Sequence, residues 1–286
     1  AGTAPGVAMQ GGGKNLVHLP GPPSEMRWMY ENRLKPWLLK TFGSQGSIRS
    51  LYIKIYDMGE AFIEERLMDL VKDQSNPTLA MYARPGFVEV RLTARADSEE
   101  QAEALLEPLE EEVRSRLNDQ IVSFNDETMA DVLGREVRQA GYIVSAAESC
   151  TGGLIGSLIT DIPGASDYFR GSAGTYCNEM KEKLLGVSHE TLERYTAVSA
   201  ETAAEMADGS RRLYGSDIAV STTGIAGPGG GTEEQPVGLV YTGVSGPWGT
   251  LVHRDVYHGG RAEIKRRAAV RAIYYVVRYL VNHKNK

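Results

Sequence analysis

Residues 148–153 of this chain are Glu148-Ser149-Cys150-Thr151-Gly152-Gly153. They follow a short, mostly apolar segment over 142–147 and precede a segment with helical spacing over 154–162. A strand, a turn of small residues and a helix in succession are typical of layered α/β proteins. Glycine allows the sharp turn between them, because it has no Cβ. We therefore predict an α/β domain built around this turn.

The same pattern continues over 123–286. Further strands are predicted over 218–223 and 238–245, and a last helix over about 261–282. The first helix of the domain should be capped by Asn125 or Asp126 and should end at Gly141. These elements predict a layered α/β domain over 123–286.

Two smaller units are predicted ahead of this domain. Residues 44–122 show the order β-α-β-β-α, with a hairpin turn at Pro85-Gly86 and an acidic amphipathic helix over 98–118. Residues 1–43 contain one short strand and one helix over 25–40, which cannot bury a core alone. We therefore expect a small α+β connector over 44–122 and, over 1–43, the last part of an N-terminal α/β domain.

Composition narrows the class of protein. The chain has 286 residues, 42% hydrophobic and 24% charged, which is ordinary for a globular protein. No apolar run approaches the roughly 20 residues that span a bilayer, and we see no signal peptide. The two cysteines, Cys150 and Cys177, lie apart in sequence, so we expect a cytoplasmic protein without disulfides. The net charge of −6 argues against a general nucleic-acid binder.

Ser149 is the first candidate for chemistry. Backbone N–H groups near residues 151–153, at the start of the predicted helix, should point back at the turn. A hydroxyl there could attack a carbonyl group, and those N–H groups could bind a phosphate or a developing oxyanion. The alternative is structural, with Ser149 and Thr151 as helix N-cap residues. The local sequence does not separate the two interpretations.

A serine nucleophile needs a base, and Lys181 is the candidate. Histidine is the usual base, but none of the five histidines lies in a context that indicates catalysis. A lysine can replace histidine when burial lowers its pKa toward neutrality. Lys181 ends the stretch Tyr176-Cys177-Asn178-Glu179-Met180-Lys181. The alternative is an ordinary solvated lysine.

A glycine-rich loop follows the predicted strand over 218–223. It reads Thr223-Gly224-Ile225-Ala226-Gly227-Pro228-Gly229-Gly230-Gly231. Such loops can bind phosphates through backbone N–H groups, although this spacing is not that of a P-loop. Arg261, at the start of the last helix, could add a cation for a phosphate. The alternatives are a flexible surface loop and a surface arginine.

Taken together, these motifs resemble a known family. Five of them occur in order: Ala-Glu-Ser-Cys-Thr-Gly-Gly (147–153), Thr-Tyr-Cys-Asn-Glu-Met-Lys (175–181), Ala-Val-Ser (197–199), the glycine-rich loop and Pro-Val-Gly (236–238). They resemble the C-terminal domain of the CinA family of competence/damage-inducible proteins, the nicotinamide-nucleotide amidase family. Residues 44–122 resemble that family's KH-like connector. Residues 1–43 resemble the end of its molybdopterin-binding-like N-terminal domain, which is associated with ADP-ribose pyrophosphatase activity.

The resemblance implies an activity and roles for individual residues. It implies hydrolysis of the carboxamide of nicotinamide mononucleotide by a serine–lysine amidase, with Ser149 as nucleophile, Lys181 as base, and Tyr176 and Thr223 in the catalytic set. Arg261 falls on a substrate-contacting arginine, and one departure is Cys177, where the family pattern has serine. We expect further substrate contacts from Thr151, Gly152, Gly153, Asn178, Gly224, Gly227, Gly229 and Gly230.

The resemblance also bears on cofactors and partners. Amide hydrolysis of this kind needs no cofactor, and a divalent metal would belong only to an intact N-terminal pyrophosphatase domain. The family suggests a homodimer. No Gly-x-x-Gly loop of the kind that clamps nucleic acid occurs between 44 and 122, so nucleic acid is not an expected partner.

Three rival hypotheses remain open at this point. Cys150 could be the nucleophile, because a thiol at a helix N-terminus has a lowered pKa. The chain could be a non-catalytic nucleotide-binding or assembly module of competence or the DNA-damage response. ADP-ribose pyrophosphatase activity could belong to the intact full-length protein, but we expect residues 1–43 alone not to form its site.

Overall fold

The computed structural model describes residues 4–43, 46–56, 58–72, 74–84, 86–117 and 121–283, with only the backbone for 121 and 122. The chain divides into two compact units. The first comprises Ala1–Ser50, Gln74–Thr78 and Leu92–Glu111, and the second comprises Leu51–Asp73, Leu79–Arg91 and Glu112–Lys286. No helix in the described ranges is both long and apolar enough to span a bilayer.

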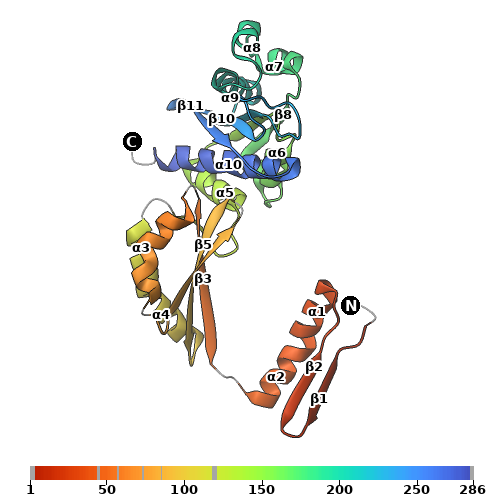
Figure 1. Ribbon diagram of the computed structural model, residues 1–286, viewed down its shortest axis with the longest axis vertical. Helices are drawn as coiled ribbons and strands as arrows, with labels where there is room; N and C mark the ends of the chain where they lie inside the picture. Colours follow the sequence, from red (N-terminus) through yellow and green to blue (C-terminus); the bar gives the residue numbers. More distant parts are fainter. Residues whose placement is uncertain are drawn as a thin grey trace. The chain divides into compact units, whose positions relative to one another are not determined.

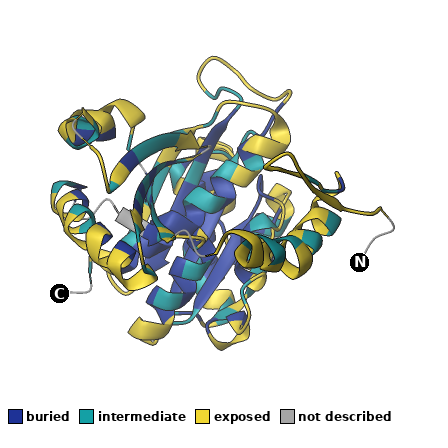
Figure 2. Ribbon diagram, turned by 90° about the horizontal axis from the view of Figure 1, so that it is seen from below, coloured by how far each residue is buried: buried dark blue, intermediate teal, exposed yellow. Residues whose placement is uncertain are grey.

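The second unit contains the predicted α/β domain, whose centre is a mixed five-stranded sheet of order β11-β10-β9-β7-β8. Strand β7 pairs in parallel with β8 and β9, whereas β10 pairs antiparallel with β9 and β11. Figure 2 shows that the central strands are buried. The strands are β7 (Val144–Glu148), β8 (Phe169–Gly174), β9 (Ile218–Gly224), β10 (Leu239–Gly246) and β11 (Gly249–Val256).

Helices cover both faces of this sheet. Helix α9 packs across the strands on one face, and α10 packs with α5 and α6 on the other (Figure 1). The apolar stripe of α10 is buried against the sheet, as its sequence spacing predicts. The helices are α5 (Met129–Ala140), α6 (Leu154–Thr160), the short 3₁₀ turn η3 (Ala165–Asp167), α7 (Asn178–Leu185), α8 (His189–Tyr195), α9 (Ala200–Tyr214) and α10 (Arg261–Val281).

The sheet topology determines where a site can form. Strand β7 lies between β8 and β9, so the chain runs from β7 to one neighbour and later returns to the other. Because the three strands are parallel, their carboxyl ends lie at the same edge of the sheet. Ligands of such sheets bind outside the carboxyl ends, where the connections diverge. The turn after Glu148 and the loops after Gly174 and Gly224 therefore meet at this edge.

Helix α5 begins later than the sequence interpretation placed it. Its N-cap is Thr128, in place of Asn125 or Asp126, and Thr128 and Asp131 form a reciprocal capping box. The backbone of Asn125 has a φ of 51°, and its side chain accepts a hydrogen bond from the N–H of Tyr52 instead. The box satisfies two helix N–H groups at once, which a cap by Asn125 would not do. The predicted end at Gly141, in the left-handed conformation, is confirmed.

The predicted connector contains a four-stranded sheet of order β4-β5-β3-β6. The order β-α-β-β-α is present. It is followed by β6, a short strand that the sequence analysis missed, which pairs antiparallel with β3 and has Ser123 opposite Lys54. Strands β4 and β5 are neighbours, as the hairpin signal predicts, although Pro85 lies outside the described residues. The elements are β3 (Ser47–Tyr56), α3 (Glu60–Lys72), β4 (Thr78–Arg84), β5 (Phe87–Ala96), α4 (Glu99–Leu117) and β6 (Ile121–Phe124).

The first residues form a hairpin and a helical segment. Strands β1 (Val7–Gly11), which the sequence analysis missed, and β2 (Lys14–His18) pair antiparallel. The helix expected over 25–40 is divided into α1 (Pro23–Met29), a π-helical turn η1 (Tyr30–Leu34) and α2 (Lys35–Phe42). Pro36 has no N–H to donate, and the N–H of Lys35 bonds to the carbonyl of Tyr30, which widens the helix at that point.

Candidate active site

A cavity of about 200 Å³ lies at the edge of the five-stranded sheet where β7, β8 and β9 end. It lies entirely within the second unit. Its walls come from the loops after the three parallel strands, from the first turns of α7 and α10, and from the loop between α8 and α9. The lining residues are Ser149, Cys150, Tyr176, Asn178, Lys181, Ala197, Val198, Thr223, Gly224, Ala226 and Arg261.

Ser149 and Lys181 meet inside this cavity. The Nζ of Lys181 lies 3.2 Å from the Oγ of Ser149 and donates a hydrogen bond of 3.0 Å to the carbonyl of Thr175. Lys181 is only 1% exposed. Burial lowers the pKa of Lys181 and outweighs the opposite effect of the two nearby cysteines, Cys177 and Cys150. A lysine in this environment can hold its amine neutral and accept a proton from a hydroxyl.

The turn that carries Ser149 is fixed by its backbone. The N–H of Ser149 donates to the carbonyl of Thr222 at 3.0 Å, and the N–H of Gly152 donates back to the carbonyl of Ser149. Gly152 and Gly153 have φ values of 64° and 96°, which a residue with a Cβ adopts rarely. The N-cap of α6 is Gly153 and makes no side-chain capping bond. The structural alternative, with Ser149 or Thr151 as N-cap, is therefore not what the structure shows.

Glu148 binds N–H groups at the start of α6, among them that of Gly153, which the sequence analysis offered to a phosphate or an oxyanion. Its buried carboxylate accepts hydrogen bonds from the N–H groups of Gly153, Ile155 and Gly156 and from the hydroxyl of Thr151. The start of α6 is thus directed at a side chain of the chain itself, and none of residues 151–153 lines the cavity. Sequence reasoning missed Glu148, although a carboxylate one residue before the nucleophile was a usable signal.

The hypothesis that Cys150 is the nucleophile requires an environment that lowers the pKa of its thiol, and the structure shows one that raises it. It is 6% exposed and packs with Val240, Ala268 and Tyr257. Burial raises the pKa of Cys150 to about 12, although its own N–H lowers it to a lesser degree. Because the thiolate is the nucleophilic form, this environment disfavours Cys150 as the attacking group.

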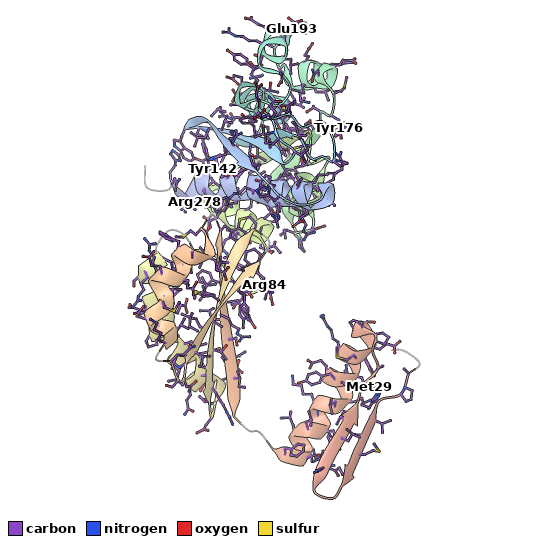
Figure 3. All side chains as sticks on the ribbon, in the orientation of Figure 1. Met29, Arg84, Tyr142, Tyr176, Glu193 and Arg278 are labelled. Carbon is purple, nitrogen blue, oxygen red and sulfur yellow. The ribbon has the colours of Figure 1, made fainter. Side chains whose placement is uncertain are left out.

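Arg261 and Tyr176 lie together at the rim of the cavity. The guanidinium of Arg261 donates to the hydroxyl oxygen of Tyr176 at 2.8 Å and to the carbonyl of Gly227 at 2.7 Å. Tyr176, which is labelled in Figure 3, follows β8. Its side chain is 67% exposed. Two of the five guanidinium N–H groups are used in this way, so others can bind an anion. The rim therefore presents a fixed cation beside the buried dyad.

Thr223 and Asn178 line the same cavity as the dyad. The hydroxyl of Thr223, at the end of β9, donates to the carbonyl of Ala197. Its oxygen can then only accept further hydrogen bonds. Asn178 is the exposed first residue of α7 and lines the cavity. The two side chains thus offer an acceptor and a donor for one planar amide group.

The structure brings most of the predicted site residues together. Ser149, Lys181, Tyr176, Thr223, Asn178, Gly224 and Arg261 line one cavity, and Gly227 joins it through Arg261. Gly229 and Gly230 are exposed and do not line it. Thr175 and Ala197, whose carbonyls hold Lys181 and Thr223, were not predicted to act, although both lie within the quoted motifs. Across the described residues, no group of three or more His, Cys, Asp and Glu side chains is arranged so that it could hold a metal ion.

Comparison with known proteins agrees with this arrangement. Residues 126–280 match the family described as CinA C-terminal domain, and residues 50–123 match the damage-inducible protein CinA KH domain. A CinA-like protein of Kosmotoga olearia is 42% identical over 280 residues, which is 98% of this chain and 68% of that protein. A putative competence-damage inducible protein of Clostridium acetobutylicum is 43% identical over 281 residues, with the same shares. The chain belongs to the CinA family.

Solved structures give the same result for the α/β domain. The competence/damage inducible protein CihA of Agrobacterium tumefaciens is 40% identical, with a TM-score of 0.52, and covers 54% of this chain and 93% of its own. A CinA superfamily protein of Klebsiella pneumoniae is 27% identical, with a TM-score of 0.52. The match covers 54% of this chain and 96% of the Klebsiella chain. The predicted α/β fold is confirmed, and its sheet is mixed.

The environment of the two cysteines predicts unequal reactivity toward iodoacetamide. Cys177 is exposed, whereas Cys150 is buried and, with a pKa of about 12, carries almost no thiolate at pH 8. We expect Cys150 to react at least about 100-fold more slowly, as mass spectrometry of the two peptides would measure. A Cys177→Ser control should take up almost no label. Equal labelling of both cysteines would contradict the buried thiol.

Proposed function

We propose that this protein hydrolyses the carboxamide of nicotinamide mononucleotide to nicotinate mononucleotide and ammonia. The observation that carries the proposal is the buried Lys181 amine, 3.2 Å from the hydroxyl of Ser149. Membership of the CinA family supports it, because the motifs that resemble that family's amidase domain are the ones that supply both residues. The relatives are named for competence and damage induction and not for a reaction, so the amidase reaction is our proposal.

The first half of the reaction forms an acyl-enzyme. Neutral Lys181 accepts the proton of Ser149 as the serine oxygen attacks the carboxamide carbon, and a tetrahedral oxyanion forms. The Lys181 ammonium then gives its proton to the departing nitrogen. The carbon–nitrogen bond breaks, ammonia leaves, and the pyridine acyl group is held as an ester of Ser149.

The second half regenerates the enzyme. Lys181, neutral again, takes a proton from a water molecule that attacks the ester carbon. The new intermediate collapses, the proton returns from Lys181 to the oxygen of Ser149, and nicotinate mononucleotide is released. One base thus serves both halves, which explains why a single buried amine is sufficient.

The cavity walls would orient the carboxamide. Because the Thr223 hydroxyl donates its hydrogen bond to the carbonyl of Ala197, the hydroxyl oxygen can accept a hydrogen bond from an N–H of the substrate amide. The Asn178 side chain can donate to the carbonyl oxygen, where negative charge develops. The volume of about 200 Å³ lies below the roughly 300–1,000 Å³ typical of sites that enclose whole ligands. We therefore place the pyridine ring and its carboxamide inside and the ribose phosphate at the rim.

Removing either member of the dyad should abolish turnover. We expect Ser149→Ala and Lys181→Ala to lower ammonia release from nicotinamide mononucleotide by about 10³-fold or more, because the two residues act as a unit. Lys183→Ala is the matched control, since Lys183 is an exposed lysine of the same helix. Cys150→Ala should retain most of the activity. Normal turnover by either dyad variant would refute the mechanism.

Arg261 should determine affinity for the phosphate. A charge-assisted hydrogen bond contributes about 1.5–3 kcal/mol, so Arg261→Ala should raise the KM for nicotinamide mononucleotide about ten- to a hundredfold. With nicotinamide riboside, which has no phosphate, the parent and the variant should differ little. Arg266→Ala, an exposed arginine of α10 outside the cavity, is the control. An equal change for both substrates would show that Arg261 does not bind the phosphate.

A further inference from the structure

Glu148 makes an unusually complete set of hydrogen bonds for a buried acid. It is the last residue of β7 and is fully buried, directly before Ser149. One carboxylate oxygen accepts from the Thr151 hydroxyl at 2.7 Å and from the N–H groups of Gly153 and Ile155 at 2.9 and 3.1 Å. The other oxygen accepts from the N–H of Gly156 at 2.9 Å and from the Ser172 hydroxyl at 2.7 Å.

Among the described residues, the carboxylate of Glu148 is held by hydrogen bonds and not by a cation. Within the described part of the chain, no lysine or arginine forms an ion pair with it, and all five donors are neutral. Three donors are N–H groups at the start of α6, where a helix favours an anion. The carboxylate therefore ties the end of β7 to the start of α6. The turn that carries Ser149 is held between these two points.

The main chain of Glu148 leads to the other member of the dyad. Its carbonyl accepts a hydrogen bond from the N–H of Thr175 at 2.8 Å. The carbonyl of Thr175 in turn accepts from the Nζ of Lys181 at 3.0 Å. Glu148 is thus connected through its side chain to the turn that carries Ser149. Its backbone is connected to Thr175, whose carbonyl binds the amine of Lys181.

We infer that Glu148 is a positioning residue, whose carboxylate sets the placement of the Ser149 hydroxyl against the Lys181 amine. The inference rests on the proposed function, because it assigns Glu148 a part in the same reaction without contact to substrate. A displacement of the reacting atoms by about 1 Å can lower a rate about 100-fold. The loss of these bonds should therefore reduce catalysis while the residues of the cavity that bind substrate remain in place.

Glu148→Gln is the variant that tests this role. Glutamine keeps the length of the side chain, but its terminal NH₂ must face backbone N–H groups of α6, whichever way the amide lies. Two donors then oppose each other and the turn must shift. We expect kcat for ammonia release to fall at least about 30-fold and KM to change less than about threefold. The acidic limb of the kcat–pH profile should move to higher pH, because a displaced turn admits water to the amine of Lys181.

Two further variants keep the test decisive if Glu148→Gln folds poorly. Thr151→Val removes the hydroxyl donor two residues after Ser149, together with its hydrogen bond to the Thr222 hydroxyl. Ser172→Ala removes the donor from β8 at the opposite carboxylate oxygen. A positioning role predicts a larger loss of kcat for Thr151→Val than for Ser172→Ala at equal melting temperature. A purely structural role predicts that activity follows the folded fraction in all three variants, and that result would overturn the inference.

A second readout separates this inference from the proposed substrate. A fluorophosphonate probe labels an activated serine whatever the natural substrate is, so its rate of reaction with Ser149 reports the dyad alone. If the parent is labelled but releases no ammonia from nicotinamide mononucleotide, the proposed substrate fails and the labelling rates still test Glu148. Labelling of Glu148→Gln at the parent rate would refute the positioning role. A parent that neither reacts nor turns over would refute both proposals.

Discussion

The removal of Lys181 from water is the constraint on which the site depends. A charged amine at 1% exposure would lack most of its hydration, and its two hydrogen-bond partners here are the hydroxyl of Ser149 and the carbonyl of Thr175. The neutral amine needs less compensation, and it has a lone pair to accept a proton. Burial of one side chain therefore supplies both the base and its orientation. The fold provides that burial by placing α7 directly after β8, beside the turn of β7.

Much of the fold could be predicted from sequence. Periodicity located β7, β9, β10, α5 and α10 to within a few residues, because each has a regular apolar face or a glycine that ends it. The short β6 was missed, because four residues after a long helix carry too little pattern. The sequence analysis placed the N-cap of α5 too early, because it relied on local composition. The spacing of three residues from Thr128 to Asp131, which is that of a capping box, indicates the correct N-cap. Long-range pairing, such as β7 between β8 and β9, has no local signature at all.

The candidate site could be predicted only in part, and for a physical reason. Ser149 and Lys181 are far apart in sequence, and spacing alone favoured neither as a catalytic residue until the motifs appeared in family order. A carboxylate directly before Ser149 was a usable signal, but the sequence does not give the direction of that side chain, on which the use of the α6 N–H groups depends. The same holds for Cys150, whose position at a helix start suggested a lowered pKa. Burial against Val240 and Ala268 raises that pKa instead.

The most direct test of the central claim is the pKa of Lys181 itself. Nuclear magnetic resonance of protein labelled with ¹³Cε-lysine follows each amine through a pH titration, and Lys181→Arg assigns the signal. Because burial disfavours the charged form, the amine should stay neutral to lower pH than other lysines, and catalysis should be lost as the pH falls through its pKa. The account predicts a lysine signal that titrates below the usual pKa of 10.5 and is absent from the variant. Titration of Lys181 at the usual value would contradict it.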